Sequence, residues 1–295
     1  MTESRGVAFV TGASRGIGKA VAQHFAKAGF DIAIGARTVH EGEAREHSST
    51  VAKSDTRPLP GSLESTAALV EAEGRQAMPV YLDILDRTTC GSSVTQVLER
   101  WGRIDVLVNN ARYIGPGHMD RLLETPVDLL DKHLEGNVMA PIILTKLVLP
   151  QMIARRSGVI MTITSGAGRG DPPAAAGEGG WGLGYGMSKG AVHRLVGIVK
   201  LEHERDGILA YNLHPGFVTT ERMIQDMGAF GFDADAGAPA DVIGAAAAWL
   251  STSPDAPALN GQWVEGQQLT HDLGLLPGWT GPSEVAVPPG DGLDA

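Results

Sequence analysis

The sequence has a single cysteine, few aromatic residues and no excess of positive charge. Cys90 stands alone among 295 residues, so no internal disulfide can form and a reducing compartment is favoured. Aromatic residues make up only 5%, whereas alanine and glycine are plentiful, which predicts a core of small aliphatic side chains. The formal net charge of −10 argues against a nucleic-acid partner, which would need a clustered basic surface.

Long apolar runs are also missing. No stretch approaches the roughly 20 apolar residues of a membrane span, and the N-terminal segment MTESRGVAFV is too polar for a signal peptide. We therefore expect a cytoplasmic protein with no membrane partner. With 43% hydrophobic and 20% charged residues, the composition is typical of a globular protein with one large or two small domains.

Short apolar runs alternate with segments of helical length. The runs lack polar alternation, as in strands buried on both faces; they are residues 7–10, 32–34, 80–82, 106–108, 159–163, 208–213 and 263–264. Helical segments at 16–28, 63–73 and 86–101 are each followed by a glycine, the usual C-terminal signal. The alternation predicts an α/β fold: one doubly wound parallel sheet in a single domain, residues 1–269, with helices on both faces.

Three segments interrupt this alternation. Residues 38–62 form a polar insertion between the second strand and its helix. Residues 166–184 contain eight glycines and two prolines, which predicts a flexible loop. The proline-containing C-terminal tail, residues 270–295, is expected to lie over the surface or to reach a neighbouring subunit.

The first strand leads directly into the turn TGASRGIG, and a helix follows. Gly12, Gly16 and Gly18 permit a tight turn and let the backbone approach a pyrophosphate, which the helix N-terminus then holds. The turn therefore predicts dinucleotide binding. A P-loop is excluded, because Ala13 stands where that motif has its first glycine and Ala20 where it has serine or threonine. A plain strand-to-helix turn would not need three glycines.

The charge after the second strand selects the cofactor. A carboxylate there would accept hydrogen bonds from the adenine-ribose hydroxyls of NAD, but the strand ends in Gly35, Ala36 and Arg37. The guanidinium of Arg37 suits a 2′-phosphate, and Arg15 in the glycine turn is placed to approach the same group. NADP(H) is therefore favoured over NAD(H). The simpler alternative is two solvated surface arginines.

Tyr185 and Lys189 stand four residues apart and so share one face of a helix. A free phenol ionises near pH ~10, and a nearby ammonium group favours the phenolate, which suits such a pair to proton exchange with a substrate. Ser165 follows strand 159–163, at the sheet edge where α/β proteins bind ligands, and is placed to donate a hydrogen bond to a substrate oxygen. A tyrosine and a lysine at this spacing also arise by chance on exposed helices, so the pair alone identifies no enzyme.

Taken in order, these motifs resemble the short-chain dehydrogenase/reductase family. The resemblance covers residues 5 to about 268 and rests on TGASRGIG, Asp83 after the third strand, the NNA of residues 109–111, Asn137, Ser165, YGMSK at 185–189 and the Pro215–Gly216 turn. It implies a Rossmann fold and an NADP(H)-dependent oxidoreductase. Such an enzyme interconverts a carbonyl and an alcohol of a small-molecule substrate by hydride transfer.

The resemblance also implies a catalytic tetrad of Asn137, Ser165, Tyr185 and Lys189. Tyr185 would be the general acid or base at the carbonyl oxygen, which Ser165 would orient and polarise. Lys189 would hold the nicotinamide ribose and stabilise the phenolate, and Asn137 would anchor a water in a proton relay. The implied cofactor-binding residues are Gly12, Ser14, Arg15, Gly16, Ile17, Gly18, Arg37, Asp83, Ile84, Asn110, Ala111, Tyr185, Lys189, Pro215, Gly216, Val218 and Thr220. Association through two long helices, 131–155 and 185–205, would give a homotetramer or a dimer.

The sequence departs from the family pattern near the predicted site. Arg112 replaces the glycine of the usual NNAG, which adds bulk and positive charge close to the cofactor. The loop 166–184 is longer than usual, and Trp181 and Leu183 near its end either face the substrate or only anchor the loop. The insertion 38–62 is expected to lie near the adenosine end and to cover the cofactor.

Two other functions fit parts of the sequence. The run GMSKG around Ser188 matches the G-x-S-x-G of serine hydrolases, and His271 follows several aspartates, but a nucleophile elbow must follow directly on a strand. A non-catalytic NADP(H) sensor would have no use for the tyrosine–lysine pair. The nine histidines show no metal-ligand spacing, so we expect no metal, and His214 is expected to be packed or solvated.

Overall fold

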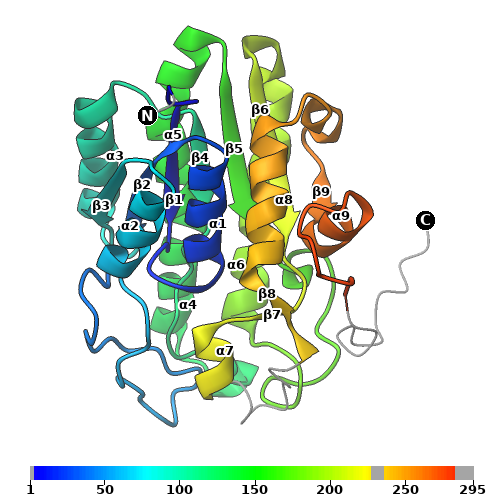
Figure 1. The fold of residues 1–295 in the computed structure, drawn as a ribbon. Coiled ribbons are helices and arrows are strands. Elements are labelled where there is room, and N and C mark those ends of the chain that lie inside the picture. The colour runs from blue at the N-terminus through cyan, green and yellow to red at the C-terminus, as the bar shows by residue number, and fades with distance from the viewer. Residues whose placement is uncertain (1–2, 227–235, 283–295) are drawn as a thin grey trace.

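The computed structural model describes residues 3–226 and 236–282, which form one parallel sheet with helices on both faces (Figure 1). The strands are β1 (Val7–Thr11), β2 (Asp31–Ala36), β3 (Ala77–Tyr81), β4 (Val106–Asn109), β5 (Gly158–Ile163), β6 (Ile208–His214) and β9 (Trp263–Glu265). Their order in the sheet is β3-β2-β1-β4-β5-β6-β9. The predicted fold class, a doubly wound Rossmann sheet, is confirmed. The order reverses between β1 and β4, and doubly wound sheets bind ligands at the carboxyl ends of the strands at this point.

The strands are buried on both faces, which explains why their sequences show no polar alternation. On one face, α1 (Gly16–Lys27), α2 (Leu63–Ala72) and α8 (Ala240–Thr252) pack against alternate strand residues such as Ala8 and Val10. On the other face, α3 (Arg87–Trp101), α5 (Ala140–Arg155) and α6 (Leu183–His203) pack against the residues between them, Val7 and Phe9 among others. The core thus has two layers, with the sheet between them.

The predicted helix ends agree with the structure at α1, α2 and α3. Ser62 caps α2, because its hydroxyl oxygen accepts a hydrogen bond from the backbone N–H of Ser65 at 3.0 Å. Gly102 ends α3 in the left-handed conformation, with φ of 70°. The edge strand β3 begins earlier than predicted, because its half-exposed residues carry a weak apolar signal. Helix α8 lies outside the predicted elements, since its alanine-rich sequence has little periodic contrast.

One long helical stretch corrects the expectation that no segment has the length and composition of a membrane span. It comprises α4 (Val127–Leu134), a π-helical turn (Glu135–Met139) and α5. By length and composition alone it could cross a membrane, and no other helix within the described residues passes that test. Its side chains Leu144 and Val148 are buried against the sheet, as in the core helix of a globular domain.

The C-terminal part of the domain runs past the boundary expected at residue 269. Before residue 269 lie three short elements: the strand β7 (Val218–Thr219), the helix α7 (Glu221–Asp226) and the strand β8 (Ala238–Pro239). Helix α9 (Gly266–Asp272) then packs against α8, and the hydroxyl of buried Thr270 donates to the carbonyl oxygen of Val242 at 2.8 Å. The domain therefore includes the first residues of the predicted tail, whose last part, 283–295, lies outside the described residues.

Candidate active site

The turn between β1 and α1 is tight enough to require glycine. Gly12 has φ of 67°, and a Cβ atom there would lie 2.8 Å from the Cα of Ala111. A Cβ on Gly18 would lie 2.3 Å from the carbonyl oxygen of Gly12. The close turn brings the backbone N–H groups at the start of α1 to the carboxyl ends of the strands, the donor set that a pyrophosphate needs. The glycine turn thus fits a dinucleotide.

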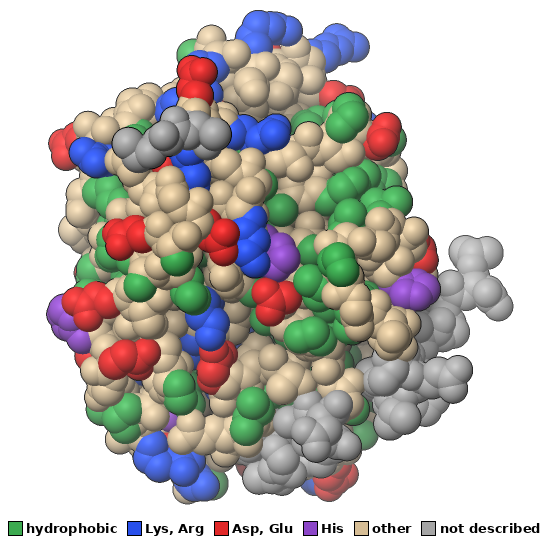
Figure 2. Space-filling model, viewed as in Figure 1, with side chains coloured by type: hydrophobic (Ala, Val, Ile, Leu, Met, Phe, Trp, Pro, Cys, Tyr) green, Lys and Arg blue, Asp and Glu red, His purple; other side chains and the backbone are tan. Residues whose placement is uncertain are grey.

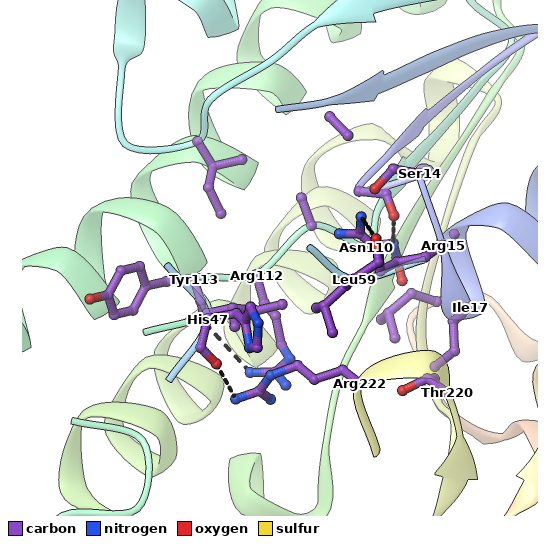
Figure 3. A pocket seen from close by; sticks show the side chains of 18 of the residues that line it. Ser14, Arg15, Ile17, His47, Leu59, Asn110, Arg112, Tyr113, Thr220 and Arg222 are labelled. Atoms are coloured by element: carbon purple, nitrogen blue, oxygen red, sulfur yellow. Dashed lines mark hydrogen bonds between the residues drawn. The ribbon is translucent and has the colours of Figure 1, made fainter. Parts of the chain in front are cut away.

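A pocket of about 330 Å³ lies beside this turn. Every residue that the family resemblance implies for cofactor binding lines it, from Gly12 in the turn to Thr220 beyond β7. Figure 3 shows part of the lining, with Ser14 and Asn110 at one end and Tyr113 at the other. The structure therefore brings the predicted set together, and binding itself stays a prediction.

The pocket is lined mainly by cations, although the whole chain is acidic. Its seven lysine and arginine side chains are Arg15, Arg37, Arg45, Arg57, Arg112, Lys189 and Arg222, against the three acids Glu43, Glu46 and Asp83. The acids accept hydrogen bonds from nearby backbone N–H groups, Glu43 from His40 at 2.8 Å, Glu46 from Ser48 at 2.8 Å and Asp83 from Leu85 at 3.0 Å. An anionic ligand is therefore favoured in this pocket.

The insertion 38–62 supplies one wall of the pocket. At its end, the guanidinium of Arg15 donates to the carbonyl oxygen of Gly61 at 2.7 Å. In its middle, Arg222 donates to the carbonyl oxygen of His47 at 3.2 Å (Figure 3). The insertion thus joins the glycine turn to the segment after β7. Arg15 holds the insertion here, and its predicted contact with a 2′-phosphate stays a prediction.

Tyr185 and Lys189 project from the first turns of α6 into the pocket. The Lys189 ammonium lies 6.0 Å from the centre of the Tyr185 ring and donates to the carbonyl oxygen of Ile163 at 2.8 Å. Burial, helped by the neighbouring Arg112 guanidinium, lowers the pKa of Lys189 to about 7. The pair therefore lies where β5 ends, at the sheet edge predicted for the reaction.

Ser165 and Asn137 lie outside the lining of this pocket. The Ser165 hydroxyl oxygen accepts a hydrogen bond from the backbone N–H of Ala167 at 3.3 Å, which caps a short 3₁₀ turn after β5. Asn137 occupies the π-helical turn; its amide oxygen accepts from the Tyr113 N–H at 2.6 Å and its amide nitrogen donates to the Ser188 hydroxyl oxygen at 2.9 Å. Within the described residues, no hydrogen bond joins either side chain to Tyr185. Their catalytic roles stay predictions.

Two side chains that the motifs do not include pack on Tyr185, and a third, His133, packs on Tyr113 of the pocket lining. The His118 ring packs on the Tyr185 ring with centres 4.5 Å apart, and the guanidinium carbon of Arg112 lies 5.7 Å from the same ring centre. Burial and the neighbouring cations hold the pKa of His118 well below its ordinary value, and burial lowers the pKa of His133 to about 4. Both rings are therefore neutral at neutral pH. Of these three side chains, only Arg112 could be singled out from the sequence, because it replaces the glycine of the family's usual NNAG.

The loop residues singled out from the sequence do not reach the pocket. Leu183 is 43% exposed at the start of α6, and Trp181 packs against Gly186, where a Cβ would lie 3.1 Å from its indole nitrogen. Neither residue lines the pocket, and Trp181 acts as an anchor of the loop. The His214 ring stacks on the Trp263 ring with centres 4.6 Å apart. Of the two roles expected for His214, packed or solvated, the structure shows the packed one.

Ser188 lacks the surroundings of a hydrolase nucleophile. It is fully buried inside α6, and its hydroxyl donates to the carbonyl oxygen of Tyr185 at 3.0 Å. His271 lies instead in α9, against Trp279. The serine hydrolase interpretation is therefore not favoured. Within the described ranges, no three His, Cys, Asp or Glu side chains lie together as metal ligands would.

Comparison of the sequence with known proteins identifies relatives of this chain. The sequence model of the short chain dehydrogenase family matches residues 6–57 and 50–227. A short chain dehydrogenase of Pseudocercospora fijiensis is 32% identical over 216 residues, 72% of this chain and 60% of that protein. The oxidoreductase UcpA of Escherichia coli is 30% identical over 213 residues, 72% of this chain and 69% of UcpA. Hydroxysteroid dehydrogenase-like protein 2 of Danio rerio matches at 34% identity, over 53% of this chain and 34% of that protein. The chain thus covers less than two thirds of the length of two of these relatives.

Solved structures agree with the sequence relatives. The crystal structure of a metagenomic short-chain oxidoreductase in complex with NADP superposes with a TM-score of 0.67 at 26% identity, over 89% of this chain and 96% of that one. A putative dehydrogenase from Xanthomonas campestris gives a TM-score of 0.74 at 26% identity, over 93% and 92% of the two chains.

Proposed function

The chain belongs to the short-chain dehydrogenase family, and we propose that it is an NADP(H)-dependent oxidoreductase that interconverts a carbonyl group and an alcohol. The observation that carries this proposal is the position of Tyr185 and Lys189 in the pocket that the glycine turn also lines. A protein that only senses a dinucleotide would need the turn but not the pair. The pair and the turn together favour an enzyme.

The charges near β2 support NADP(H) as the cofactor. Arg37 follows β2 directly and lines the pocket. The nearest acids in sequence that also line the pocket, Glu43 and Glu46, accept hydrogen bonds from the insertion's own backbone, so ribose hydroxyls would have to compete for them. A 2′-phosphate would find a cationic wall instead, and a similar structure was solved with NADP.

Bound NADPH would supply the hydride for carbonyl reduction. The Tyr185 hydroxyl would donate a proton to the carbonyl oxygen, and Lys189 would stabilise the phenolate left behind. Ser165 would orient the same oxygen from the end of β5, after a side-chain rotation that frees it from the N–H of Ala167. Lys189 is held in place for this role by the carbonyl oxygen of Ile163.

The wider setting of the enzyme is also proposed. We propose a cytoplasmic homodimer or homotetramer that acts on a small molecule and has no nucleic-acid or membrane partner. The acidic net charge and the burial of the apolar side of α5 support this view.

Turnover of NADPH with a panel of aldehydes and ketones tests the proposal. We expect Tyr185→Phe to lose about 10²- to 10⁴-fold in kcat/KM while it still binds NADPH, because only the proton donor is removed. Tyr81→Phe, at an exposed tyrosine on β3, is the matched control and should match the wild type. Arg37→Ser should lower the preference for NADPH over NADH by about 10-fold or more. A wild type that binds NADPH but turns over no carbonyl would leave the sensor alternative.

A further inference from the structure

Among the residues that the structure describes, Arg112 has no salt-bridge partner, and it lies beside Tyr185. It follows Ala111 just beyond β4, its side chain is half-buried, and it lines the pocket. Its one hydrogen bond within residues 3–226 and 236–282 is a long contact of 3.5 Å to the carbonyl oxygen of Tyr113. No Asp or Glu in those ranges forms a salt bridge with it. Arginine stays protonated at all working pH values, so this charge is permanent.

Within the described part of the chain, no group around Arg112 pairs with its positive charge. Arg222 is a cation in the same pocket, and Lys189, whose pKa is lowered to about 7, carries only part of a positive charge at neutral pH. His118 and His133 are buried and neutral. The carboxyl oxygens of Asp120, in the same segment, accept hydrogen bonds from the backbone N–H groups of Val51 at 3.0 Å and Gly117 at 2.7 Å. A partly buried cation in such surroundings lacks compensation that a bound anion would provide.

We propose that the substrate is a carbonyl compound that carries a carboxylate, and that Arg112 binds this carboxylate beside Tyr185. The proposal rests on the proposed reduction of a carbonyl at Tyr185. The planar fork of a guanidinium matches a carboxylate with two parallel hydrogen bonds. The carbonyl oxygen must reach the Tyr185 hydroxyl, so a substrate anion close to that ring falls within reach of Arg112.

The phosphates of the cofactor are the other anions that could reach this pocket. They have their own donors in the glycine turn between β1 and α1 and at Arg37 after β2. Arg112 instead lies next to the ring that exchanges the proton. Its charge is therefore assigned to the substrate, and the experiment separates the two sources.

The test compares keto acids or aldehyde acids with their methyl esters. The pairs are acetoacetate, 4-oxopentanoate and 4-formylbenzoate, each with its methyl ester. The wild type is expected to prefer the acids, and Arg112→Met should lower kcat/KM by about 10- to 100-fold for the acids and little for the esters. Arg112→Lys should restore part of the preference, since it keeps the charge but not the fork. Arg45→Met is the matched control, because Arg45 lines the same pocket but pairs with Glu43; it should change acids and esters by the same factor.

A binding measurement without turnover completes the test. The complex of Tyr185→Phe with NADPH should be stabilised against heat by the acids more than by the esters, and Arg112→Met in that background should remove the difference. NADPH affinity should stay within about threefold of the parent. Equal effects on acids and esters, or a large loss of NADPH affinity, would assign Arg112 to the cofactor and overturn the inference. If no carbonyl is reduced at all, the proposed function fails, while acid binding that depends on Arg112 would still support the anion site.

Discussion

At the scale of single residues, Lys189 carries the clearest consequence of burial. Its pKa is lowered to about 7 by burial and by Arg112. In the unfolded chain the same amine has an ordinary pKa near ~10.4. Between these two values the unfolded state binds a proton that the folded state does not, so this group makes the free energy of unfolding rise with pH. Below about pH 7 the folded state bears the full cost of the buried charge.

Lys189→Met should remove this pH dependence. Relative to the wild type, the variant should gain stability as the pH falls from about 9 to about 6, by about 1–3 kcal/mol over that range. Urea denaturation at a series of pH values measures the difference. Lys146→Met, at an exposed lysine on α5, is the control and should show no such trend. A wild-type–variant difference that stays constant over the range would contradict a buried lysine with a lowered pKa.

The residues of the site were predictable to different degrees. Gly12 and Gly18 could be predicted because consecutive residues determine the geometry of their turn. The partner of Arg15 could not, because Gly61 lies 46 residues away and only the path of the insertion brings it near. His118 carries no motif at all, since its contact with Tyr185 depends on how the segment after β4 folds back over α6.

At the scale of elements, the π-helical turn between α4 and α5 shows what local propensity cannot predict. The sequence predicts a helix through Asn137, and a helix is present, but the turn at Glu135–Met139 is wound more loosely. Contacts from Tyr113 and Ser188 hold the Asn137 amide at both ends. Such turns often occur at functional sites. The sequence thus predicts the element, whereas tertiary contacts determine its local form.

The insertion 38–62 is a closed loop on the domain surface that reaches over the pocket. Its two ends lie together, because the Leu63 N–H donates to the carbonyl oxygen of Thr38 at 3.0 Å. Its middle is tied down at two further places, by Arg222 at Ser49 and by Asp120 at Val51. A loop whose ends are already joined can be shortened without pulling β2 and α2 apart.

Replacement of residues 41–60 by Gly-Ser-Gly should therefore leave the fold intact but weaken the hold on the cofactor. We expect NADPH to dissociate about 10-fold faster or more, because one wall of the pocket is lost. Stopped-flow fluorescence of bound NADPH measures the rate, and circular dichroism checks the helix content. An unchanged dissociation rate in a folded variant would show that the insertion does not cover the cofactor.

At the scale of the whole molecule, charge is distributed differently on the surface and in the pocket. Figure 2 shows Asp and Glu side chains interspersed with Lys and Arg over one face. The pocket, in contrast, gathers seven lysine and arginine side chains against three acids in a chain of net charge −10. Net charge could be counted from the sequence, where it argues against a broad basic surface. The local excess of lysine and arginine in the pocket could not be predicted in the same way, because it draws on the insertion, the segment after β4, α6 and α7 together.

Exposed apolar side chains on α5 and α6 point to the proposed assembly. Leu147 of α5 is 42% exposed, and Ile198 and Leu201 of α6 are 51% and 81% exposed. Ile198 and Leu201 are three residues apart, so they share one face of the helix. In a two-fold symmetric interface each residue occurs twice, and burial of one leucine is worth about 1.5–3 kcal/mol.

Leu201→Asp should therefore weaken the assembly strongly, by about 100-fold or more in the dissociation constant. Size-exclusion chromatography with light scattering should give a dimer or tetramer for the wild type and a smaller species for the variant. Leu123→Asp is the control: Leu123 is 98% exposed but lies in the turn before α4, away from the two helices, and its replacement should leave the mass unchanged. Both variants should retain the wild-type helix content, because neither side chain belongs to the core. A monomeric wild type, or an oligomer that Leu201→Asp does not disturb, would exclude this face of α6 as the interface.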